Sequence, residues 1–136
     1  MSEAPKKKKR EFRNIHVTEL GHYRLPLAGV ISFLHRISGA LMFLLLPYVL
    51  YLLDQSLLSE DTFSDFKGMI DHWYVKLVLL ALCWAYLQHF SAGIRHLVMD
   101  NHIGLDKDSA RQSSVVVLAV TLPLTALVAL KLFGAF

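Results

Sequence analysis

The sequence predicts an all-α integral membrane protein with three transmembrane helices. Of its 136 residues 54% are hydrophobic, and they come in long blocks. The blocks cover about residues 25–53, 73–99 and 114–136, and each exceeds the roughly 20 residues that cross ~30 Å of hydrocarbon as a helix. Stretches such as LMFLLLPYVLYLL and SVVVLAVTLPLTALVAL are apolar on every side, whereas a soluble bundle helix carries one apolar stripe. Lipid is therefore the solvent that these helices fit.

The first block is not predicted to be a cleaved signal peptide, although a basic segment precedes it. It is too long for the apolar region of such a peptide, and it carries His35 and Arg36 within it. Cys83 is the only cysteine, so the sequence offers no disulfide framework and no C-x-x-C-H haem attachment. We expect Cys83 simply to pack.

Charge divides the chain into a basic N-terminal segment, residues 1–24, and a membrane anchor domain, residues 25–136. Seven lysines and arginines precede the first block, whereas the loop over 54–72 has five acidic residues and one lysine. The positive-inside rule therefore places the N-terminus and the second loop in the cytoplasm, and the acidic loop and the C-terminus on the far side. The basic tail is expected to fix this topology. The alternative is a more specific function, in which the tail contacts anionic lipid or an acidic partner. A nuclear-localisation role for KKKKR, and with it nucleic acid, does not fit a chain with three spans.

Polar residues interrupt the first and second blocks on one helical face each. At 100° per residue, one face of each helix gathers these polar and small side chains: Ser32, His35, Arg36 and Gly39 on the first, and His89, Gly93 and His96 on the second. Small residues on such faces allow a second helix or a flat ligand to come close.

Arg36 and His89 are predicted to lie at the same depth. Each is about ten residues from the cytoplasmic membrane face, or ~15 Å along its helix. An arginine at such depth costs about 3 kcal/mol on insertion scales, so it needs a negative or acceptor-rich partner. No Asp or Glu lies within the three blocks near it. Its partner is therefore expected to be a ligand, water or another subunit.

A carboxylate-bearing, flat ligand would explain both the arginine and the glycines, and haem b has these properties. Neutral imidazole is a good iron ligand, and a porphyrin fits a close-packed apolar slot. Its propionates would meet Arg36, His35 and His96. The competing interpretation is a set of hydrogen-bonded packing residues, because lone intramembrane histidines often serve that purpose.

The two motifs together resemble the cytochrome b membrane anchors of succinate dehydrogenase, respiratory complex II. SFLHRISG matches the family pattern S-x-x-H-R-x-S-G, and HFSAGIRHLVMD matches H-x-x-x-G-x-R-H-x-x-x-D. Order and spacing agree, a third span follows, and the resemblance covers roughly residues 22–133. The segment FRNIHVTELGHYRLP departs from the R-P-x-S-P-H-like stretch that many members carry before the first span.

The resemblance implies functions for five of the matched residues. His89 would be the axial ligand of the haem iron and the chain's only metal ligand. His35, Arg36 and His96 would lie near the haem propionates, and Ser32 with Arg36 would line the quinone site. None of these residues is expected to be catalytic in succinate oxidation itself.

The resemblance also implies that the three helices form part of a heteromeric bundle. The expected partners are a flavoprotein subunit, an iron-sulfur subunit, a second small membrane anchor that shares the haem b, and membrane lipid. FAD and iron-sulfur clusters would then lie only in partner subunits, and electrons from succinate would pass to ubiquinone. The expected location is the bacterial inner membrane, with a cytoplasmic N-terminus and a periplasmic C-terminus.

Two rival functions remain open on the sequence. The first is a haem-free structural anchor of a quinone-linked respiratory complex, with the polar cluster hydrogen-bonded internally. The second is a small transporter that uses His35 and Arg36 as a substrate gate, which the absence of a second, inverted three-span half disfavours.

Overall fold

The computed structural model describes residues 18, 22 and 24–134. Within them the chain forms four helices and no strand: α1 (Leu27–Leu58), α2 (Glu60–Ile70), α3 (Trp73–Asp100) and α4 (Lys107–Leu132). Three of these, α1, α3 and α4, are long and apolar enough to cross a membrane. The predicted all-helical membrane fold is therefore confirmed. The basic segment predicted over residues 1–24 lies almost wholly outside the described residues.

The helix α1 begins after Pro26, which has an extended backbone conformation. Proline is tolerated at the start of a helix, where its missing N–H would have no partner in any case. Few of its side chains are buried within the chain, namely Ile31, Ser38 and Leu52. Others face outward, and Phe43 is 74% exposed. Such exposure of large apolar side chains is ordinary for a helix surrounded by lipid, and it leaves wide surfaces for other subunits.

The acidic segment between the first two spans is not the plain loop that its charge suggested, because it contains α2. Ser59 and Thr62 form a capping box, in which each side chain satisfies a backbone N–H of the other residue. Glu60 and Asp61 lie in the first turn and Lys67 in the last, so the charges complement the helix dipole. The acidic residues thus stabilise a helix as well as marking a side of the membrane.

The helix α4 begins at Lys107, ahead of the apolar block that starts near residue 114. The side chain of Asp106 accepts a hydrogen bond from the backbone N–H of Ser109 at 2.9 Å and caps the helix. This hydrogen bond lowers the pKa of Asp106. The polar stretch KDSARQS therefore joins the helix as its first turns.

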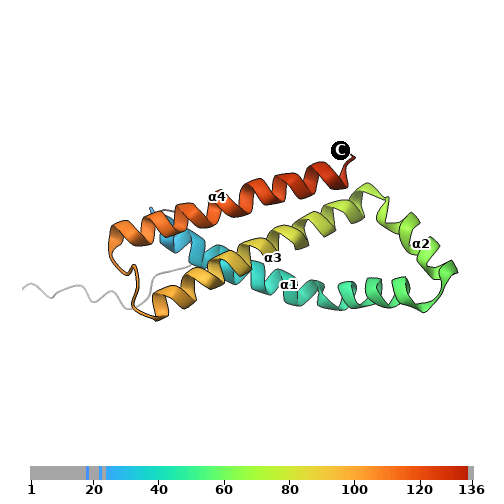
Figure 1. The fold of residues 1–136 in the computed structure, drawn as a ribbon, viewed down its shortest axis with the longest axis horizontal. Coiled ribbons are helices and arrows are strands. Elements are labelled where there is room, and N and C mark those ends of the chain that lie inside the picture. Colours follow the sequence, from blue (N-terminus) through green and yellow to red (C-terminus); the bar gives the residue numbers. More distant parts are fainter. Residues whose placement is uncertain (1–17, 19–21, 23, 135–136) are drawn as a thin grey trace, which may run out of the picture.

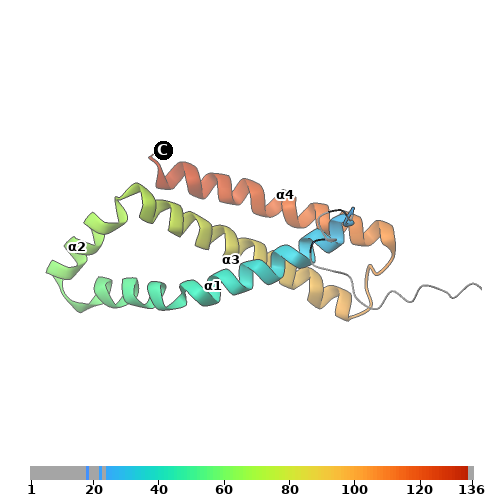
Figure 2. The ribbon, with the colours of Figure 1, turned by 180° about the vertical axis from the view of Figure 1, so that it is seen from behind.

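The central helix is α3, with α4 running alongside it and α1 crossing it obliquely (Figure 1). All three meet where Ile31, Ala92 and Val117 form a small buried core. From that crossing α1 and α3 diverge, and α2 joins their far ends, as the view from behind also shows (Figure 2). The functional motifs of α1 and α3 lie near the crossing rather than in the open part.

Candidate cofactor site at the crossing of α1 and α3

Three histidines gather where α1 crosses α3. The rings of His35 and His89 stack, with centroids 4.1 Å apart and planes 13° from parallel. The ring of His96 lies 5.0 Å from that of His35 and is tilted by 55°. The polar faces that the 100° period predicts for the two helices are thus in direct contact through these rings. Among the described residues no group of three His, Cys, Asp or Glu side chains is arranged to hold a metal ion by itself.

Glycines on the two helices make room for this stack. A methyl group on Gly39 of α1 would lie 2.9 Å from Cε1 and 3.1 Å from Nδ1 of His89. Real Cβ atoms do not come so close, and the obstacle is a ring held in contact rather than a loose chain end. A methyl group on Gly93 of α3 would meet His35 Nε2 at 3.6 Å, which is an ordinary contact. Gly39 is therefore the position that the His89 ring requires.

The backbone of α1 orients the His89 ring. Nδ1 of His89 lies 3.1 Å from the carbonyl oxygen of His35, and a carbonyl can only accept. Nδ1 therefore carries the proton, and Nε2 of the neutral ring keeps its lone pair. The buried hydroxyl of Ser38 donates to the same carbonyl at 2.8 Å and lies 3.5 Å from Nδ1. Ser38, which sequence reasoning did not select, thus supports the same arrangement.

The first-span pair Ser32 and Arg36 lies beside the histidines rather than among them. Ser32 is half-buried and Arg36 is exposed. Neither side chain forms a hydrogen bond or an ion pair with any residue between 24 and 134 that the structure describes. The charge of Arg36 is thus left available at the surface of α1, next to the His35 ring.

Sequence reasoning missed two polar residues of α3 that face α4. Gln88 is fully buried, and its Oε1 accepts a hydrogen bond from Thr121 at 3.2 Å. Arg95 is part of the second motif but was assigned no function there, and it is buried and bonded to α4. The signal that could have revealed these polar contacts between α3 and α4 is the set of small hydroxyl residues along α4, namely Ser113, Ser114 and Thr121.

Comparison with known proteins decides the family. The family described as succinate dehydrogenase/fumarate reductase transmembrane subunit matches residues 9–128. The chain belongs to this family. It is a multi-pass membrane protein and a membrane anchor subunit, in agreement with its three candidate spans.

Similar proteins carry one shared name, succinate dehydrogenase cytochrome b556 subunit. The protein from Paracoccus denitrificans is 30% identical over 111 residues, which cover 82% of this chain and 85% of that protein. The Coxiella burnetii protein is 36% identical over 83 residues, which cover 60% of this chain and 66% of the relative. The Rickettsia felis protein is 26% identical over 123 residues, which cover 89% of this chain and 96% of the relative.

Proposed function

We propose that this chain is the haem b-binding membrane anchor of a succinate dehydrogenase, with His89 as its axial ligand to the iron. The observation that carries the proposal is the hydrogen bond from His89 Nδ1 to the His35 carbonyl, because it leaves Nε2 as the metal-binding nitrogen. The stacked His35 ring covers a flat face of the imidazole, whereas an iron ligand binds in the ring plane. The residues therefore fit the group that the relatives' printed name implies.

The remaining polar residues complete this proposed site. His35 and His96 lie next to the ligand and Arg36 beside them, where they would meet the haem propionates. When bound, haem b supplies a one-electron redox couple. The chain's own residues orient the imidazole, fix its proton on Nδ1 and keep a cation nearby. A second small anchor subunit supplies the other ligand in this proposal.

A spectrum of the isolated complex tests the haem assignment. The complex is purified through this chain in mild detergent, its other subunits are identified, and a reduced-minus-oxidised spectrum is recorded. We expect a low-spin b-type signal that His89→Ala abolishes and that His35→Ala or His96→Ala weakens less. A low-spin signal unchanged by His89→Ala would overturn the assignment. A complex with the expected flavoprotein and iron-sulfur partners but no haem would instead identify a structural anchor.

Ser32 and Arg36 are proposed to form part of the ubiquinone site. They lie about one helical turn apart on α1, and Arg36 has no protein partner among the described residues that would neutralise it. A hydroxyl can donate to a quinone carbonyl, and a guanidinium stabilises the negative charge that builds as the quinone takes electrons. Electrons would reach this site from succinate through the iron-sulfur partner.

Assays with two different electron acceptors distinguish a defect in the quinone site from a defect elsewhere in the electron path. Arg36→Leu should reduce ubiquinone reduction far more than succinate oxidation with a soluble artificial acceptor, and Arg36→Lys should retain part of the activity. Ser32→Ala removes a donor without removing a cation that could serve the haem. If Ser32→Ala leaves the apparent quinone affinity and turnover unaltered, this part of the proposal is wrong.

The proposed orientation places the N-terminus in the cytoplasm and the C-terminus in the periplasm of a bacterial inner membrane. The structure puts α2 and the end of α4 on the side opposite to the α3–α4 loop, as the ribbon shows (Figure 1). A Glu60→Cys change in a Cys83→Ser background should be labelled from the periplasm of intact cells. Labelling only from the cytoplasmic side of sealed inverted vesicles would reverse the orientation.

A further inference from the structure

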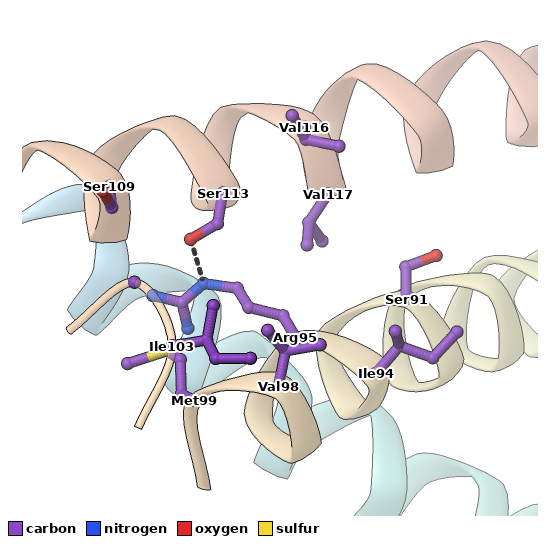
Figure 3. A pocket seen from close by; sticks show the side chains of 11 residues that line it. Ser91, Ile94, Arg95, Val98, Met99, Ile103, Ser109, Ser113, Val116 and Val117 are labelled. Atoms are coloured by element: carbon purple, nitrogen blue, oxygen red, sulfur yellow. Dashed lines mark hydrogen bonds between the residues drawn. The ribbon is translucent and has the colours of Figure 1, made fainter. Parts of the chain in front are cut away.

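Arg95 is a buried cation that the proposed cofactor site does not use. Its side chain is only 6% exposed and lies between α3 and α4. Nε donates to the hydroxyl of Ser113 at 3.0 Å, and Nη2 donates to the carbonyl oxygen of Ala110 at 3.3 Å. Figure 3 shows the guanidinium reaching across from α3 to Ser113. These contacts orient the group but do not neutralise it.

No carboxylate balances this charge within the described part of the chain. Between residues 24 and 134 no Asp or Glu oxygen lies within 4.0 Å of the guanidinium, and Nη1 forms no hydrogen bond with any described residue. The acids of this end, Asp100, Asp106 and Asp108, are exposed instead. A buried charge is costly unless it is paired, so a protein that retains one generally provides it with an anion.

The same arginine lines a cavity of about 460 Å³ between α3, α4 and their connecting loop. The rest of the wall is mostly aliphatic, with Ile94 and Val98 from α3, Val116 from α4 and Ile103 from the loop. Figure 3 shows these side chains around the arginine. A cavity with one fixed cation and apolar walls suits an anion that carries hydrocarbon.

The cavity lies near the end of α3 that is predicted to meet the cytoplasmic membrane face. Arg95 lies about five residues before the end of α3 at Asp100, which is ~8 Å along the helix. The cavity is also separate from the histidines, because Arg95 faces α4 whereas His89 faces α1. Disruption of one site can therefore be measured independently of the other.

We propose that this cavity binds the phosphodiester headgroup of an anionic phospholipid. Arg95 Nη1 would donate to a phosphate oxygen, and an acyl chain would lie against Ile94, Val98 and Val116. The same charge would also attract free inorganic phosphate, but phosphate would leave the apolar wall uncovered. The lipid is therefore the occupant that satisfies both the cation and the aliphatic lining.

Lipid retention by the intact complex tests the proposal. The complex is placed in nanodiscs of dioleoylphosphatidylcholine with graded dioleoylphosphatidylglycerol, and bound lipid is counted by native mass spectrometry. We expect a retained phosphatidylglycerol whose apparent affinity falls by about tenfold or more in Arg95→Gln, because a charge-assisted hydrogen bond is lost. Arg111→Gln, which removes an exposed charge at the same end of α4, should change it by less than about twofold.

A second variant keeps the test valid if Arg95→Gln fails to assemble. Val116→Trp places a larger side chain at the wall against which the acyl chain would lie and leaves Ser113 and Ala110 themselves unchanged, so it should also abolish retention. Neither variant should alter a spectrum that depends on His89. Phosphatidylglycerol retained as in the wild type by Val116→Trp would overturn the proposal. Inorganic phosphate that raises the thermal midpoint in detergent as much as the lipid does would also overturn it.

Discussion

The helix α3 carries two polar faces that handle their polar groups in opposite ways. Toward α1, the half-buried His89 forms a hydrogen bond through Nδ1 to the His35 carbonyl, and this bond does not involve Nε2. Toward α4, the fully buried Gln88 and the nearly buried Arg95 bond across to serine, threonine and carbonyl groups. The α1 face thus leaves a ring nitrogen without a described protein partner, whereas the α4 face joins two helices through hydrogen bonds. Variants on the two faces should therefore fail by different measurements.

Gly39→Ala is expected to have the largest effect, and on the α1 face only. The added methyl would lie 2.9 Å from the His89 ring, so the ring must move away from the His35 carbonyl. We expect loss or conversion of the low-spin haem spectrum, while the complex still assembles. Gly93→Ala is the matched control, since its methyl meets His35 at an ordinary 3.6 Å, and it should retain the spectrum. Equal loss in both variants would show that the fit at Gly39 is not special.

Thr121→Val should weaken the α4 face without touching the spectrum. The change leaves Gln88 Oε1 without its donor, beside an Nε2 that already has no hydrogen-bond partner in the described structure. An unsatisfied buried group costs about 1–3 kcal/mol, so the thermal midpoint in detergent should fall. Adding Gln88→Leu to Thr121→Val should recover most of the loss, because both polar partners are then gone. A double variant as unstable as the sum of the single ones would contradict the pairing.

Ser38→Ala is a milder change on the α1 face. The hydroxyl shares the His35 carbonyl with His89 Nδ1, and its removal leaves the imidazole with one competing donor fewer at that carbonyl. A stronger hydrogen bond at Nδ1 makes the imidazole a more basic ligand, so the haem midpoint potential should move to lower values. Redox titration of the isolated complex measures the shift. A potential equal to the wild-type value would mean that Ser38 only packs.

The smallest expected effect is a pH dependence at the start of α4. The pKa of Asp106 is lowered by its hydrogen bond from the Ser109 backbone, so the ionised cap stabilises the fold above the carboxyl's unfolded pKa. That contribution disappears as the pH falls through the lowered, folded-state pKa. Thermal midpoints of the wild type and Asp106→Asn should therefore converge as the pH falls below the carboxyl's ordinary range. A difference that stays constant down to the acid unfolding of both proteins would exclude the cap as its source.

The histidine cluster was predictable because helical period and depth are properties of each span by itself. Counting residues from one membrane face placed Arg36 and His89 in one layer, and the structure brings His35, beside Arg36, against His89. The pairing of Gln88 and Arg95 with α4 was not predictable in the same way. A helical wheel identifies a polar face, but it does not say which neighbour covers that face. The helix α2 was missed for a local reason, because the Ser59 cap was hidden within a segment noted only for its charge.

On the proposed assignment of His89, the carbonyl of His35 would also set an order of events during biogenesis. Membrane helices insert singly before they associate, and an α3 that has not met α1 lacks the acceptor that holds the proton on Nδ1 of His89. The ligand that we propose for iron is therefore completed by helix association rather than by translation. If His89 binds the iron as we propose, haem loading would report that α1 and α3 have docked, and an unassembled chain would be a poor acceptor of the cofactor.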